Sequence, residues 1–162
     1  MIILLFVAGC SSDPSGSVEA YVGVNCGGSI NHTGDDVYAY DASDLFMTQS
    51  IQAGGHSNGS TTDIGVNIFN GNSLVEEGDY TITSGGNQSG TAYVFFQPTR
   101  ESHYEFISQD NQGVVRVLNA SYDSETPPQI TFLDVEFDNV IMTNFNTGQD
   151  TCISSYRLHV EQ

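Results

Sequence analysis

One pentapeptide of this chain matches a catalytic motif. Gly55-His56-Ser57-Asn58-Gly59 has the G-x-S-x-G spacing of a nucleophile elbow, in which a serine sits on a strained turn between a strand and a helix. The sequence that follows argues against this chemistry, because the strand-like run from Ile64 to Phe69 stands where the motif requires a helix. We therefore expect no catalytic residue and interpret the segment as a mobile surface loop, with a small hydrolase that uses Ser57 as an alternative function.

Three carboxylates alternate with apolar residues near the end of the chain. Asp134, Glu136 and Asp138 are spaced two residues apart, which places all three on one face of a strand. Calcium prefers oxygen ligands, and a bound cation would relieve the repulsion within the row. Calcium sites usually gather their ligands from a tight loop, however, so the pattern favours a solvated outer face. We expect no metal centre and no cofactor, with calcium at this row as the alternative; the 4 histidines are isolated in the sequence, so zinc is not expected.

The apolar opening of the chain ends at Val7-Ala8-Gly9-Cys10, and a linker-like segment, Ser11 to Ser17, follows directly. This junction resembles the lipobox of bacterial lipoproteins. The resemblance implies that residues 1–9 are a signal peptide, that Cys10 becomes the lipid-modified N-terminus, and that residues 10–17 tether a single domain, 18–162. The segment departs from that pattern in having no Lys or Arg before Cys10, which a translation start further upstream would explain.

The lipobox resemblance also implies a location. A lipidated cysteine would hold the protein in the bacterial cell envelope, with the membrane as its first partner. The residue after Cys10 is Ser11 and not Asp. By analogy with the best-known lipoprotein sorting rule, this implies the outer membrane, with the domain facing the periplasm or the cell surface.

Two further cysteines, Cys26 and Cys152, end alternating segments near the two ends of the chain. The exported compartment that the lipobox implies permits a disulfide between them. If the segments pair antiparallel with Cys26 opposite Cys152, Val22 meets Tyr156 and the apolar faces of both segments agree. We therefore expect the first and last strands to lie side by side and to be joined by a Cys26–Cys152 disulfide.

Between these ends, apolar residues recur at every second position in short runs, and Gly- and Asn-rich turns separate the runs. With the two terminal strands, this pattern predicts one all-β domain, an antiparallel β-sandwich of about 8–10 strands, with a β-barrel as the alternative. The candidate strands are Val37 to Tyr40, Leu45 to Ile51, Ile64 to Phe69, Tyr80 to Thr83, Ala92 to Phe96, Tyr104 to Ser108, Val114 to Asn119 and Ile130 to Met142.

Three short motifs follow an order seen in a group of exported proteins. Gly78-Asp79-Tyr80, Gly113-Val114-Val115-Arg116-Val117 and Val135-Glu136-Phe137 are similar to the G-x-Y, G-x-V-x-V and x-F series of small β-sandwich lipoproteins of uncharacterised function. The resemblance implies a fold and a location without a reaction.

Charge narrows the choice of partners. The chain carries 20 acidic residues against 3 arginines and lysines, a formal charge of −17, which repels nucleic acids. Tyr38 and Tyr40 share a strand face, as do Tyr93 and Phe95; exposed, such rings could form a platform for a sugar or a peptide, but core positions are the favoured interpretation. The leading function is a non-catalytic, envelope-anchored binding module for a protein or glycan, with an adhesin-like assembly subunit as the first alternative.

Overall fold

The computed structural model describes residues 13–23, 30–58, 62–98 and 105–162, and most of them lie in strands. The elements in chain order are β1 Ser15–Gly23, β2 Ile30–Gly34, β3 Asp36–Asp41, α1 Ser43–Phe46, β4 Ser50–His56, β5 Asp63–Phe69, β6 Gly78–Ile82, β7 Thr91–Gln97, β8 Phe106–Ser108, β9 Val114–Tyr122, β10 Ile130–Asn144 and β11 Asp150–Glu161.

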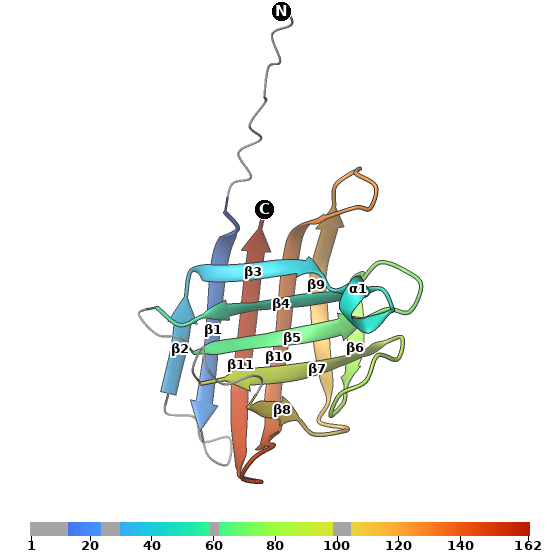
Figure 1. The fold of residues 1–162 in the computed structure, drawn as a ribbon. Helices are drawn as coiled ribbons and strands as arrows, with labels where there is room; N and C mark the ends of the chain where they lie inside the picture. Colours follow the sequence, from blue (N-terminus) through green and yellow to red (C-terminus); the bar gives the residue numbers. More distant parts are fainter. Residues whose placement is uncertain (1–12, 24–29, 59–61, 99–104) are drawn as a thin grey trace, which may run out of the picture.

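The strands form one sheet that folds over itself into two layers. Its order is β2-β1-β11-β10-β9-β6-β7-β5-β4-β3, and β8 pairs with both β10 and β7. In Figure 1, β3, β4, β5 and β7 form the front layer and run across the strands of the rear layer. The pairs are antiparallel except for β6 with β7, where the chain passes from one layer to the other. The prediction of an all-β, sandwich-like domain is confirmed.

Most predicted strands are present, and one is wrong. Residues 45–51 were expected to form a strand, but α1 occupies Ser43–Phe46 and the next strand, β4, begins only at Ser50. Asp41 accepts hydrogen bonds from the backbone N–H and the hydroxyl of Ser43, and Met47 ends the helix in a left-handed conformation at φ 57°. Local capping therefore outweighs the alternation of this segment. Strand β2, Ile30–Gly34, was not predicted from the sequence.

Strand β4 corrects the interpretation of the serine motif. Gly55 and His56 belong to the strand and pair with Ile64 and Asp63 of β5, so they are not part of a surface loop. A Cβ on Gly55 would lie 2.8 Å from Cγ1 of Val18, which explains why glycine occupies this position. Two layers approach closely there, and the glycines that look like turn residues in the sequence serve packing instead.

The first and last strands are paired, as predicted, but with a different register. Val18 lies opposite Leu158 and Ala20 opposite Tyr156, two residues from the expected pairing. A bulge after Tyr21 then shifts the register again, so that Gly23 lies opposite Cys152.

The same bulge changes which side of β11 faces the core. Tyr156 is in the core. Nearer the start of the strand, the core residue is Ile153 and not Ser154, the residue that strict alternation predicts. The strict alternation that placed Cys152 on the Tyr156 face is therefore wrong. Cys152 is 1% exposed and disulfide-bonded. Cys26 and Cys10 lie outside the described residues, so the Cys26–Cys152 pairing stays a prediction.

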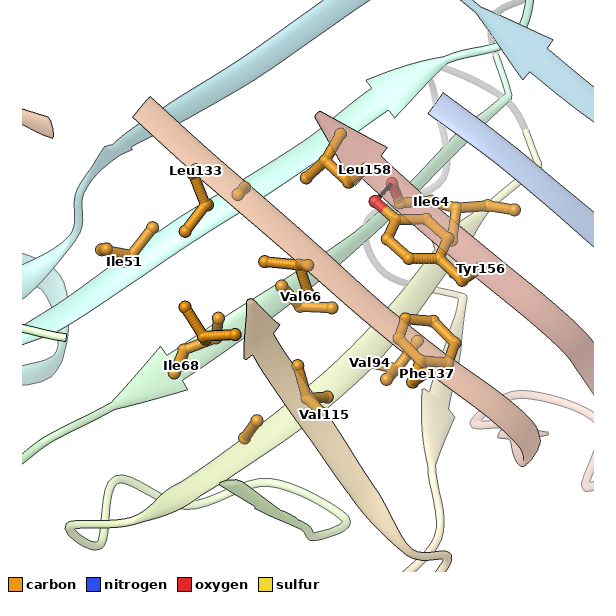
Figure 2. Close-up of a cluster of buried hydrophobic side chains, with 14 of the residues drawn as sticks. Ile51, Ile64, Val66, Ile68, Val94, Val115, Leu133, Phe137, Tyr156 and Leu158 are labelled. Atoms are coloured by element: carbon orange, nitrogen blue, oxygen red, sulfur yellow. Dashed lines mark hydrogen bonds between the residues drawn. The ribbon is translucent and has the colours of Figure 1, made fainter. Parts of the chain in front are cut away.

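The main core lies between the two layers. Tyr156 of β11 crosses it: the ring is fully buried, stacks on Phe137 of β10 with centroids 4.5 Å apart, and donates a hydrogen bond from its hydroxyl to the Ile64 carbonyl of β5 at 3.2 Å (Figure 2). The aliphatic side chains of the same core include Ile51, Val66, Ile68, Val94, Val115, Leu133 and Leu158 (Figure 2).

Candidate functional site

The serine motif does not assemble a nucleophile site. The Ser57 hydroxyl donates to the Thr33 carbonyl at 3.5 Å, and the Ser57 N–H donates to the Thr62 carbonyl at 3.1 Å. Strand β4 ends at His56 and β5 begins at Asp63, so the connection between them is too short for the helix that a nucleophile elbow requires. Both observed contacts tie the serine to backbone carbonyl groups of neighbouring segments.

The carboxylate row on β10 lies in a ladder of ion pairs. Glu136 accepts from Arg116 on β9 at 2.8 Å and from Arg157 on β11 at 3.0 Å. Asp138 lies 3.4 Å from Arg157, and Asp134 lies 2.6 Å from His159. The three carboxylates therefore face cross-strand basic partners, and the described residues hold no group of three acidic, histidine or cysteine side chains arranged to bind a metal.

We expect calcium to stabilise the protein no more than sodium chloride of equal ionic strength does. Each carboxylate of the row already has a cross-strand basic partner, and added salt screens the formal charge of −17 in either case. Thermal unfolding with each salt, in the wild type and in Glu136→Gln, measures this. The variant should lose about 1 kcal/mol, because its arginine partners are half exposed. A calcium-specific rise in melting temperature that Glu136→Gln abolishes would contradict the assignment to ion pairs.

The front layer carries a different arrangement on the side that faces away from the main core. Because side chains alternate along a strand, the residues between Ile51, Ala53, Ile64, Val66 and Ile68 of the core all point to this other side. We call it the outer polar face, and its polar members are Ser50, Gln52 and His56 of β4 with Asp63 and Asn67 of β5.

Register aligns these residues in rows across the layer. His56 of β4 lies between Asp36 of β3 and Asp63 of β5. The row two residues further along β4 and β5 has glycines at its centre, Gly54 and Gly65. The third row places Gln52 beside Asn67, with Tyr40 paired with Gln52 at one end and Tyr93 paired with Asn67 at the other.

The outer polar face concentrates unpaired polar atoms. Within the described residues, the buried side-chain nitrogen and oxygen atoms that form no hydrogen bond are Oγ of Ser50, Nδ1 of His56, Oδ1 of Asp63 and both amide atoms of Asn67. All of them lie on this one face. Asn67 is fully buried, and an unpaired buried donor or acceptor costs about 1–3 kcal/mol. Such a cluster on two adjacent strands marks a place where a polar ligand or water would be stabilising.

Asp63 is the charged centre of the outer polar face. Its Oδ2 accepts a hydrogen bond from the Tyr38 hydroxyl at 2.7 Å, and its side chain is mostly buried. Burial raises the pKa of Asp63, while the Tyr38 hydrogen bond and the charge of His56 oppose the rise. His56 Nδ1 lies 3.3 Å from Asp36 Oδ2, so a second carboxylate stands on the other side of the imidazole.

Aromatic rings cover this face. Tyr38 and Tyr40 stack with centroids 5.9 Å apart. At the other end of the face, Phe46 of α1 packs edge-on against Phe69 at 5.1 Å and lies 6.3 Å from Tyr93. The alternation that placed Tyr38 with Tyr40 and Tyr93 with Phe95 is therefore seen in the structure, with all four on one face. Tyr93 and Phe95 are buried, whereas Tyr40 is 42% exposed.

The outer polar face was not predicted from the sequence. His56 was treated as isolated, because Asp36 and Asp63 come beside it only through strand pairing. One signal was present: Asp63, Gly65 and Asn67 alternate with Ile64, Val66 and Ile68, which marks a polar side of a strand. The pattern does not tell whether aromatic residues from other strands cover that side.

Comparison with protein-family models, with curated proteins and with solved structures finds no match for this chain. In the residues that the structure describes, no helix has the length and apolar character of a membrane span. The fold and the outer polar face therefore define the class of protein: an all-β, sandwich-like domain with polar residues enclosed on one outer side.

Proposed function

We propose that this chain is a bacterial envelope lipoprotein whose β domain is a non-catalytic binding module. The observation that carries the anchor is the Val7-Ala8-Gly9-Cys10 junction, followed at once by a Ser-rich linker. Strand β1 begins at Ser15, within the predicted tether, so four residues, 11–14, separate a lipidated Cys10 from the sheet. Fully extended, the five residue steps from Cys10 to Ser15 span about 17 Å, which would hold the domain close to the outer-membrane surface.

The outer polar face supports the binding role. A catalytic site needs a nucleophile or acid–base pair open to a substrate, whereas Ser57 contacts backbone carbonyl groups and Asp63 is bonded to Tyr38. Enclosed polar atoms beside aromatic rings are typical of sites that hold a ligand. Protein and glycan ligands are both consistent with this role.

An adhesin-like assembly subunit is the second candidate. Strands β2 and β3 stand at the two ends of the sheet order, where a strand from another chain could add. Both edges are partly occupied, because Gln162 donates to the Ala39 carbonyl of β3 and the Asn58 N–H donates to the Thr33 carbonyl of β2. Concentration-dependent oligomers in light scattering would favour assembly over ligand binding.

We expect Cys10→Ala to release the protein from the membrane fraction or to leave it unprocessed. Lipid chains contribute about 0.8 kcal/mol for each buried CH₂ group, and the variant has no thiol to carry them. Fractionation and intact-mass analysis measure the effect, with Cys26→Ser as the control that should stay in the membrane fraction. A mature protein that retains Met1 and has no lipid mass would refute the anchor.

A further inference from the structure

We propose that the outer polar face is a binding site for a neutral saccharide, and that Phe46 of α1 closes the end of this face near Asn67 in this structure. The assignment deepens the proposed function, because it names the ligand class of the binding module. It rests on the clustering of unpaired polar atoms on β4 and β5, on the rings around them and on the charge of the chain.

The unpaired atoms present both donors and acceptors along one face, with Ser50 and Asn67 toward one end and Asp63 at the other. Asn67 offers an N–H₂ group and a carbonyl oxygen, Asp63 an acceptor oxygen and Ser50 a hydroxyl. Sugar hydroxyl groups donate and accept at closely spaced positions, so a saccharide can pair with such a mixed set. A metal ion would need several oxygen or nitrogen ligands of the acidic or histidine type, and no such group of three occurs in the described residues.

Peptides and acidic glycans fit this face less well. A peptide that binds by strand addition needs a free sheet edge, but β4 pairs with β3 and β5, and β5 pairs with β4 and β7. Recognition here must therefore use side chains. Asp36 and Asp63 lie in one row of the face, and the chain carries −17 overall, so an anionic ligand would be repelled.

Aromatic rings supply the second element of a saccharide site. Tyr38 and Tyr40 stack on one another at one side of the face, and Tyr40 is 42% exposed. Tyr93 is the cross-strand neighbour of Asn67 on the other side. Such a ring offers an apolar surface to the C–H groups of a sugar.

Among the elements whose rings lie over the outer polar face, helix α1 is the one with no buried residue. Its Leu45 and the C-cap residue Met47 are 69% and 94% exposed. The Phe46 ring nevertheless packs on Phe69 and Tyr93, next to Asn67, and its carbonyl accepts from the Asn87 side chain at 2.9 Å. Moving α1 outward would uncover the rings of Phe69 and Tyr93 beside Asn67 without breaking any strand pairing.

The experiment applies the lipidated full-length protein, in phosphatidylcholine vesicles, to an array of neutral glucans, mannans, galactans and xylans together with uronic-acid and sialic-acid glycans. We expect a neutral glycan to bind. Titration calorimetry with that glycan should show that Asn67→Val weakens binding by at least about tenfold, as expected for lost hydrogen bonds to the ligand. Asn119→Val, the same change on β9 of the rear layer, is the matched control and should bind normally.

The glycan affinity of Phe46→Ala tests whether Phe46 closes a ligand site or has only a structural role. If Phe46 closes the site, its removal shifts the population toward the open form and tightens binding, whereas a purely structural ring would leave the affinity unchanged or weaken it. An array on which neither the wild type nor Phe46→Ala binds a neutral glycan overturns the assignment, as does an unchanged affinity of Asn67→Val. Binding of an acidic glycan alone overturns the ligand class and leaves the binding module intact, and association with the vesicles reports on the lipid anchor separately.

Discussion

Replacing Tyr156 by alanine is expected to lower the free energy of unfolding by about 3–5 kcal/mol. The ring is fully buried between the layers, stacks on Phe137 and reaches Ile64 on the opposite layer, so its loss leaves a cavity at the centre of the main core (Figure 2). Urea unfolding followed by circular dichroism measures the change, and an unaltered dependence on denaturant would show that the fold is retained.

Tyr156→Phe is the matched control, because it keeps the stacked ring and removes only the hydroxyl. It should cost about 0.5–1.5 kcal/mol, the usual net value of one hydrogen bond. A Phe variant that is as unstable as the Ala variant would mean that the bond to the Ile64 carbonyl, rather than ring packing, joins the two layers.

Much of the fold could be predicted from alternation alone. β5 shows why: Ile64, Val66 and Ile68 recur at the period of a strand, and the core lies on their side. β4 was harder, because its sequence Ser-Ile-Gln-Ala-Gly-Gly-His contains two glycines that resemble turn residues. Gly54 is required by crowding, since a Cβ there would lie 2.7 Å from the Ile64 carbonyl oxygen. Close approach of two segments is a tertiary property that a single segment does not display.

The candidate site could be predicted only in part. The sequence placed Asp134, Glu136 and Asp138 on one face, but not the arginines that pair with them, because Arg116 and Arg157 arrive from other strands. For the outer polar face the sequence indicated a polar side of β5, which alternation normally assigns to solvent. Tyr93 and the short helix α1 cover that side, and the contact of Phe46 with Tyr93 depends on a helix that the sequence did not predict.

The carboxylates on the two outer sides of the sandwich therefore differ in their solvation and in their ion-pair partners. On the rear layer, Glu136 is matched by two half-exposed arginines, so its environment is solvated and paired. On the front layer, Asp63 is enclosed with one oxygen unpaired, and burial raises its pKa. Folding favours the neutral form of such a group, so this residue lowers stability as the pH rises from the unfolded-state pKa through the folded one. An enclosed carboxylate of this kind is easier to explain at a binding face than in a purely structural layer.

The last prediction concerns the disulfide of Cys152. The chain has 3 cysteines, and Cys152 is disulfide-bonded. If Cys10 carries lipid through its sulfur, only Cys26 remains to bond with Cys152. We therefore expect Cys26→Ser and Cys152→Ser each to lower the free energy of unfolding by about 2–5 kcal/mol, and Cys10→Ala to leave it unchanged. The bond would close a loop over most of the domain, and β1 and β11 would be joined where Gly23 lies opposite Cys152.

Non-reducing peptide mapping of the purified protein identifies the partner, and denaturant unfolding of the three variants gives the energies. Wild type measured under reducing conditions should match the two serine variants, which separates loss of the bond from any effect of serine itself. The β domain should stay folded in each case, because its core residues, such as Tyr156 and Ile64, do not depend on the bond. Recovery of a Cys10–Cys152 peptide, with Cys10→Ala as the destabilised variant, would refute the disulfide prediction and the lipid anchor together, since one sulfur cannot serve both.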